Sequence, residues 1–256
     1  MGMKTLLLAA VLVLSLPCQA DDLWPRAVAW GEQFKDWVPG TMVMVSEMLD
    51  KNGKATETTE IHFRLFQPAG GELEQELVKY IENGKDLTAS KRAEMEKAEA
   101  EEEAKDKKRR AESGERKGEG DGESVSVGVE VAGVFHPDLQ KETQASAGVQ
   151  RKAVGARMGL GHPFTQKQKD GSLLKGTAWL DRATGLPLEV DYAPDPFPKH
   201  VKEMATVIRY GPGEGENWHA SELVTEGTGG ILFIKKRFRL TMKFGDYFLY
   251  APPPAP

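Results

Sequence analysis

The feature that most constrains the fold is a regular alternation of apolar and basic residues near the end of the chain. The apolar set is Ile234, Phe238, Leu240, Met242 and Phe244, and the basic set is Lys235, Arg237, Arg239 and Lys243. Successive side chains of an extended strand point to opposite sides, so this segment has one apolar and one charged face. A strand with one buried and one solvated face is typical of an antiparallel sheet with a single core side.

Turn residues divide much of the remaining sequence into short extended segments. Asn52-Gly53 separates two alternating runs, which is the strongest short signal for a hairpin, and Ile61, Phe63 and Leu65 share one face of the second run. The stretch "ELVKYIE" before "NGKD" fits either another strand or a helix. Further turns are expected at Pro137-Asp138, Asp170-Gly171, Thr184-Gly185, Gly211 to Gly215 and Gly229-Gly230. The region from about Ser124 to Tyr250 is therefore predicted to be antiparallel strands.

The first twenty residues have the pattern of a secretory signal peptide. Lys4 supplies the positive start, Leu6 to Leu16 form a short apolar run, and Cys18-Gln19-Ala20 precedes the expected cleavage. The alternative is a lipoprotein signal with Cys18 acylated, which Pro17 disfavours. We expect the protein in the periplasm or secreted, with no transmembrane segment in the mature chain. Cys18 is the only cysteine, so no disulfide supports the mature fold.

An amphipathic helix is predicted directly after the signal peptide. Its apolar stripe is Leu23, Ala27, Trp30, Phe34 and Trp37, at spacings of three and four, and Pro39-Gly40 is expected to end it. The stripe fits a core-facing helix, and it fits equally a helix that covers a ligand cavity.

Residues 89–123 differ in character from the rest of the chain. Thr88 is a candidate N-cap, and the sequence to Ala111 is rich in helix-forming and oppositely charged residues, with alanine as its only stripe. After Ser113 the composition favours a flexible linker. This insertion is either a solvated excursion from the sheet or an arm that binds a protein. The tail at residues 251–256 is rich in proline.

The sequence holds few signals for catalysis or for a cofactor. The net charge of −5 makes nucleic acid a poor partner. The five histidines have no spacing typical of a metal site, and no nucleophile elbow, P-loop or dinucleotide motif occurs. Asp181 and Gly185 have the residue types of a hairpin turn, so we interpret Asp181 as structural. We expect a protein without enzymatic activity, cofactor or metal, although an unassigned hydrolase is a third hypothesis.

The segment "WLDRATGLPLEV" at 179–190, the aromatic N-terminal helix and the Asn-Gly hairpin with "HFRLF" together carry a resemblance. They are similar to features of periplasmic outer-membrane lipoprotein-sorting and carrier proteins, the LolA/LolB-like superfamily, which they resemble also in chain order: signal peptide, aromatic helix, Asn-Gly hairpin and then a long run of antiparallel strands. The charged insertion departs from that pattern. The resemblance implies a curved antiparallel sheet or incomplete β-barrel, with helices on its concave side and a cavity for acyl chains or a partner's apolar surface.

We therefore expect a mainly β (α+β) protein: a single half-barrel-like domain at 21–250, interrupted by 89–123, with the N-terminal helix on the concave face. The first functional hypothesis is a non-enzymatic carrier that binds a lipid acyl chain or a lipoprotein. The alternative is an envelope protein-interaction module that acts through the 89–123 arm. The candidate lining residues of the cavity are Trp30, Phe34, Trp37, Met42, Met44, Ile61, Phe63, Leu65, Gly176, Ala178, Phe238, Leu240 and Met242. Gly176 and Ala178 are included because small residues on a buried face leave room for the N-terminal helix or for a lipid chain.

Overall fold

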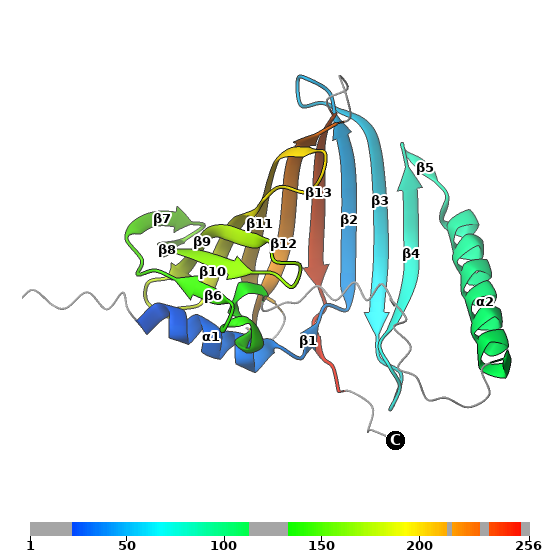
Figure 1. Cartoon of the computed structure of the whole chain (residues 1–256), viewed down its shortest axis with the longest axis horizontal. Coiled ribbons are helices and arrows are strands. Elements are labelled where there is room, and N and C mark those ends of the chain that lie inside the picture. The colour runs from blue at the N-terminus through cyan, green and yellow to red at the C-terminus, as the bar shows by residue number, and fades with distance from the viewer. Residues whose placement is uncertain (1–21, 113–132, 214–216, 231–235, 252–256) are drawn as a thin grey trace, which may run out of the picture.

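The computed structural model describes residues 22–112, 133–213, 217–230 and 236–251 (Figure 1). Most of them belong to one antiparallel sheet of twelve strands, in the order β5-β4-β3-β2-β13-β12-β11-β10-β9-β8-β6, with β7 also paired to β8. The sheet is strongly curved and does not close into a barrel (Figure 1). This confirms the predicted fold class, including the N-terminal helix on the concave face.

The strands of the large sheet are β2 (Thr41–Leu49), β3 (Ala55–Phe66), β4 (Glu74–Glu82), β5 (Lys85–Asp86), β6 (Thr143–Ala145), β7 (Gln150–Val154), β8 (Arg157–Lys167), β9 (Leu173–Asp181), β10 (Pro187–Asp195), β11 (Val201–Pro212), β12 (Trp218–Gly229) and β13 (Lys236–Gly245). A separate pair is formed by β1 (Trp37–Val38) and β14 (Phe248–Leu249). The helices are α1 (Leu23–Phe34) and α2 (Thr88–Glu112), with two 3-10 turns, η2 (Gly133–Phe135) and η3 (Pro137–Leu139).

The predicted hairpins form where their turn residues allow a left-handed backbone. Between β2 and β3, Gly53 has a φ of 80°, and the Asp50 side chain accepts hydrogen bonds from the backbone of Asn52 and Lys54. Between β4 and β5, Asn83 and Gly84 have φ values of 50° and 81°. The stretch "ELVKYIE" is therefore a strand, and its alternative interpretation as a helix is wrong.

Helix α1 forms on the predicted stripe, but it ends earlier than expected. Its buried side is formed by Leu23, Ala27, Trp30 and Phe34. Trp37 lies beyond its end, in β1, because the segment Trp37–Val38 pairs with β14. The prediction that Trp37 belongs to the helix is wrong, although its side chain still packs against the same core.

The segment before β6 also differs from the expectation of continuous strands. Residues 133–139 form η2 and η3, because Val134 and Phe135 insert into the core beneath α1 and are 7 % and 0 % exposed. Residues 1–21, 113–132 and 252–256 lie outside the described residues, and with them the signal peptide, the linker and most of the proline-rich tail. No helix of the described ranges has the length and apolar character to cross a membrane.

Helix α2 lies along β4, the last long strand before the short edge strand β5 (Figure 1). Arg92 donates from Nε to the backbone oxygen of Leu77 at 2.7 Å and from Nη2 to that of Val78 at 3.3 Å. The backbone N–H of Tyr80 donates to the Thr88 hydroxyl at 2.9 Å. The start of α2 thus satisfies polar groups that an edge strand would otherwise expose to pairing.

Thr88 is not the N-cap that the sequence suggested. The helical hydrogen bonds begin with Lys91 N–H and the Leu87 carbonyl, and the Thr88 hydroxyl donates to Asp86 instead. The helix reaches the sheet through Lys91, Met95 and Ala98 rather than through its predicted alanine stripe, whose members Ala89, Ala93, Ala100 and Ala104 are exposed.

Candidate ligand-binding face

One face of the sheet carries apolar side chains across most of its width. Met44 pairs with Ile61 on β3 and with Met242 on β13, and Met242 pairs in turn with Leu223 on β12. Directly opposite residues of an antiparallel pair lie on the same face. The register therefore places apolar residues of neighbouring strands side by side on the concave face, as the alternation of Leu240, Met242 and Phe244 predicted.

Helix α1 occupies the half of this face formed by β8 to β12. Trp30 donates from Nε1 to the Trp218 carbonyl at 2.9 Å, and its ring contacts Tyr210 edge-on with centroids 5.5 Å apart. Ala178, which is 0 % exposed, lies in the same core. Trp30, Phe34, Trp37 and Ala178 thus belong to the core between α1 and the sheet.

Gly176 is small for a local reason. A Cβ at this position would lie 1.9 Å from the Asp191 carbonyl oxygen and 2.7 Å from the Tyr192 Cβ, both on β10. The close approach of the two backbones, rather than space for a ligand, accounts for the glycine.

Gly176→Ala is expected to lower the free energy of unfolding by about 1–3 kcal/mol, because the added methyl group forces β9 and β10 apart. The matched control is Gly211→Ala, where the nearest atom to the new Cβ is the Ser221 Oγ at 3.9 Å. Urea denaturation of both variants measures the difference. Equal stability of the two variants would contradict the close approach at β9–β10.

A second apolar cluster covers the other half of the concave face. Met42, Leu65 and Met242 are buried, at 2 %, 5 % and 8 % exposure. Half-buried side chains pack against them, namely Val38, Met44, Phe63, Leu223, Leu240 and Phe244. The structure therefore brings six of the predicted lining residues into this cluster, Met42, Met44, Phe63, Leu65, Leu240 and Met242. Of the described helices, α1 lies over the other half.

The side of this cluster next to α2 holds a pocket of about 300 Å³. Its floor is Ile61, Phe63, Leu77 and Tyr80, and α2 closes it with Lys91, Glu94, Met95 and Ala98. Two predicted residues, Ile61 and Phe63, line this pocket. Phe238 lies further along β13, in a pocket of about 270 Å³ with Leu49 and Met204. Leu77 and Met95 also line the pocket next to α2 and were not among the predicted lining residues, although the alternation in "ELVKYIE" could have identified Leu77.

The charged groups at the mouth of the α2 pocket are paired with each other. Lys91 Nζ lies 2.7 Å from Glu94 Oε2, and the hydrogen bond to Glu94 raises the pKa of the lysine. The same ammonium lies 5.6 Å from the centroid of the Tyr80 ring. The pocket is thus apolar inside, with an ion pair at its mouth, which suits a hydrocarbon chain better than a charged ligand.

Asp181 has the structural role that the sequence indicated. Its Oδ1 accepts hydrogen bonds from the backbone N–H of Ala183 and Thr184, and Arg157 lies 3.0 Å from its Oδ2. Burial alone would raise the pKa of this carboxyl, but the two N–H groups and Arg157 hold it below its usual value. Both oxygens of the carboxylate therefore have partners, and these contacts stabilise the turn. In the described ranges, no group of three or more His, Cys, Asp or Glu side chains could hold a metal ion.

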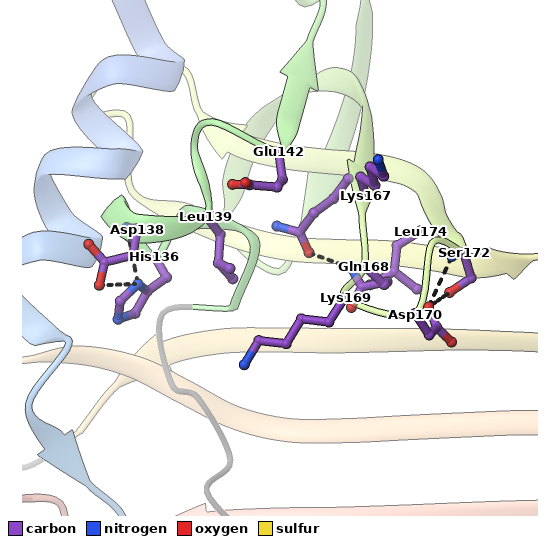
Figure 2. Close-up of a pocket in the computed structure, with 11 residues that line it drawn as sticks. His136, Asp138, Leu139, Glu142, Lys167, Gln168, Lys169, Asp170, Ser172 and Leu174 are labelled. Atoms are coloured by element: carbon purple, nitrogen blue, oxygen red, sulfur yellow. Dashed lines mark hydrogen bonds and ion pairs between the residues drawn. The ribbon is translucent and has the colours of Figure 1, made fainter.

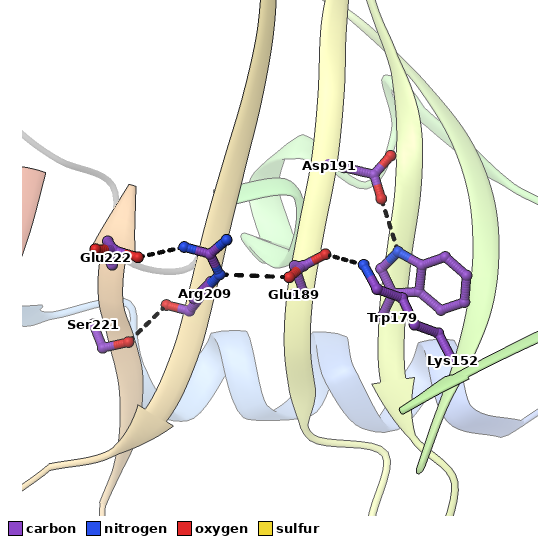
Figure 3. Close-up of polar contacts among 7 residues, drawn as sticks. All are labelled: Lys152, Trp179, Glu189, Asp191, Arg209, Ser221 and Glu222. Carbon is purple, nitrogen blue, oxygen red and sulfur yellow. Dashed lines mark hydrogen bonds and ion pairs between the residues drawn. The ribbon is translucent and has the colours of Figure 1, made fainter. Parts of the chain in front are cut away.

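The opposite, convex face carries a row of polar contacts (Figure 3). Glu189, whose side chain is 10 % exposed, lies 2.6 Å from Lys152 Nζ and 3.6 Å from the Arg209 guanidinium. Arg209 also pairs with Glu222, which continues the row onto β12. Because these charges satisfy one another across four strands, they stabilise the sheet locally.

Two further carboxylates of β10, those of Asp191 and Asp195, have separate polar contacts. The Asp191 carboxylate accepts a hydrogen bond from the Trp179 indole at 2.7 Å (Figure 3), and Asp195 pairs with Lys175. Each carboxylate therefore has its own partner.

Comparison with known proteins gives structural likeness only. No family model matches the chain, and no curated protein matches it. A solved LolA superfamily protein from Nitrosomonas europaea is similar at 9 % identity and a TM-score of 0.35, covering 91 % of this chain and 94 % of that one. A putative outer-membrane lipoprotein-sorting protein domain from Vibrio parahaemolyticus is similar at 12 % identity and a TM-score of 0.36, covering 87 % and 91 %. The likeness to these two solved structures is at a level that transfers no family, residue role or ligand.

Proposed function

We propose that this protein binds an acyl chain of a lipid or lipoprotein on the concave face of its sheet and acts as a carrier without catalysis. The observation that carries the proposal is the second apolar cluster, where Met44, Phe63 and Leu240 stay half-buried on the face beyond α1. The proposed location is the periplasm, which the signal-like first twenty residues support. The proposed unit is a single domain at 21–250 with the insertion at 89–123.

The free energy available from such a site is sufficient. Each buried methylene contributes about 0.8 kcal/mol, so a chain of about 14 carbons gains on the order of 11 kcal/mol before ordering costs. Association costs an estimated 4–15 kcal/mol, so the gain exceeds the cost over most of this range. The second apolar cluster is wide enough to take a flexible hydrocarbon chain. Binding such a chain requires no reacting group in the protein.

The direct test is native mass spectrometry of the protein after gentle extraction from the periplasm of the expressing cells. We expect an additional mass that corresponds to an acyl-chain compound. A clean mass of the protein alone, together with no binding of a dansyl-labelled fatty acid, would contradict the proposal.

Leu240→Glu is expected to weaken binding of the dansyl fatty acid at least about tenfold, because a carboxylate in the second apolar cluster opposes burial of the acyl chain there. The control is Lys243→Glu on the same strand, an exposed position whose alternation places it on the convex face. Fluorescence titration measures both variants, with thermal unfolding to verify that each is folded. Equal affinities would show that the acyl chain binds elsewhere.

A second candidate function is protein binding through α2. The observation that favours it is the exposure of the half of α2 beyond Ala98, where Glu101, Glu102, Ala104 and Lys105 face solvent. Site-specific crosslinking from position 105 in intact cells would test it, with position 85 in β5 as the control. A specific adduct from position 105 alone is the expected result under this alternative.

A further inference from the structure

A large pocket lies away from α2, at the other end of the concave face. It has a volume of about 1000 Å³ and lies between the η2–η3 segment and the turn that joins β8 to β9 (Figure 2). Its lining is His136, Asp138, Leu139, Glu142, Gln166, Lys167, Gln168, Lys169, Asp170, Ser172 and Leu174. Leu139 and Leu174 are its only apolar lining residues, so its chemistry is polar.

This pocket borders the apolar face. Gln166 pairs with Leu174, and by alternation they share the side of the sheet that carries Phe164 and Ala178. Leu174 pairs with Pro194 on β10, next to Tyr192, which packs partly against the main core. The pocket therefore lies on the same face of the sheet as the second apolar cluster, at the edge of the half that α1 covers.

The pocket offers charges of both signs. Figure 2 shows the Lys169 side chain extending from the β8–β9 turn toward the η3 segment, and Glu142 on the opposite wall. Neither side chain has an ion-pair partner within the part of the chain that the structure describes. Asp170 is already engaged, because its Oδ1 accepts from the backbone and hydroxyl of Ser172. Lys169 and Glu142 thus remain available to a ligand as a cation and an anion, and Lys167 is a second cation in the lining.

Amide groups add fixed polar contacts between these charges. Gln166, which is 4 % exposed, donates to the Thr143 hydroxyl at 3.0 Å and accepts from the Gln168 amide at 3.1 Å. These bonds fix the orientation of the Gln166 side chain. A ligand entering the pocket would therefore meet a preorganised polar wall between Lys169 and Glu142.

We propose that this pocket binds the zwitterionic headgroup of an amphiphile whose acyl chain lies on the concave face. Lys169 contacts the phosphate and Glu142 the ammonium group, so that neither charge of the ligand is left unpaired. This inference rests on the proposed function and adds the substrate class. A purely anionic headgroup would face Glu142 without a compensating charge, and an uncharged one would leave Lys169 and Glu142 desolvated.

The test compares three amphiphiles with the same acyl chain: lysophosphatidylethanolamine, lysophosphatidylglycerol and monoacylglycerol. Each displaces the dansyl fatty acid from the full mature protein. The wild type is expected to bind lysophosphatidylethanolamine about tenfold more tightly than either of the other two. Lys169→Gln and Glu142→Gln are each expected to abolish this preference while leaving the affinity for monoacylglycerol unchanged. Lys141→Gln, exposed and outside the pocket, is the control that keeps the preference.

The outcomes separate the two proposals. Equal affinity for the three amphiphiles, a preference for lysophosphatidylglycerol, or a preference that survives both substitutions would overturn the headgroup site and leave acyl binding intact. Failure of all three amphiphiles and of the dansyl fatty acid to bind would overturn the proposed function together with this inference.

Discussion

Replacing Trp30 by alanine is expected to lower the free energy of unfolding by about 3–5 kcal/mol. The side chain is 5 % exposed and packs against Phe34, Phe135 and Tyr210, with ring centroids 5.8, 6.2 and 5.5 Å away. The substitution removes these contacts and the hydrogen bond to Trp218. It leaves a cavity where α1, the η2 turn and the sheet meet, so the loss exceeds the transfer free energy of the ring alone.

Urea denaturation monitored by far-ultraviolet circular dichroism measures this effect. The control is Leu249→Ala, which removes an apolar side chain that is 60 % exposed and should change the stability by no more than about 0.5 kcal/mol. A decrease in the free energy of unfolding of less than about 1 kcal/mol for Trp30→Ala would contradict tight packing of α1 against the sheet.

Acidification is expected to destabilise the protein through His219. The imidazole is 2 % exposed and stacks on Tyr247 with centroids 4.2 Å apart, with Phe34 and Trp37 also in contact. Neither ring nitrogen has a hydrogen-bond partner among the described residues. Burial in this apolar environment lowers the pKa of His219 to about 4.

The sign of the effect follows from proton linkage. As the pH falls from about 6.5 to about 4, the unfolded chain binds a proton at this position and the folded chain does not, so stability is lost. The expected contribution is about 3 kcal/mol between pH 7 and pH 4. His219→Phe should remove this part of the pH dependence, because the ring then carries no titrating group.

Free energies of unfolding at pH 7 and pH 4, for wild type and His219→Phe, measure the contribution as a difference. Carboxylates such as Asp181 titrate in both proteins and cancel in this comparison. The control is His200→Asn, an exposed position with a φ of 69°, which should retain the full pH dependence. The same pH dependence in wild type and His219→Phe would contradict the buried neutral imidazole.

The sequence predicts the parts of this structure that depend on local periodicity. Alternation around Leu240 and Met242 identified the buried face of β13, and the spacing of Trp30 and Phe34 identified the buried stripe of α1. The error at Trp37 arose because helical spacing continues into a segment that long-range pairing with β14 draws into a strand.

Other parts depend on contacts between distant segments and have no local signal. Arg92 donates hydrogen bonds to two backbone oxygens of β4. Any sequence of β4 would present these oxygens, so no residue pattern predicts the contact. Glu189 belongs to a polar row and looks solvent-exposed, yet Lys152 and Arg209 from other strands bury it. The polar pocket requires the η3 segment to meet the β8–β9 turn, and neither segment has a periodic pattern.

The prediction of the binding face was partial for the same reason. The alternation of β2, β3 and β13 placed Met44, Phe63 and Leu240 on one face, which the register confirms. Which half of that face α1 would occupy could not follow from the sequence, because the helix stripe fits any apolar surface of sufficient width. Their role as a ligand lining stays a prediction.

The most direct test of acyl binding on the concave face is photo-crosslinking with a fatty acid that carries a diazirine at its terminal carbon. After irradiation and proteolysis, mass spectrometry locates the adducts. We predict adducts in the peptides that contain β2, β3 and β13, with competition by unlabelled fatty acid and loss in Leu240→Glu. Adducts confined to convex-face residues, or labelling that unlabelled fatty acid does not reduce, would contradict the account.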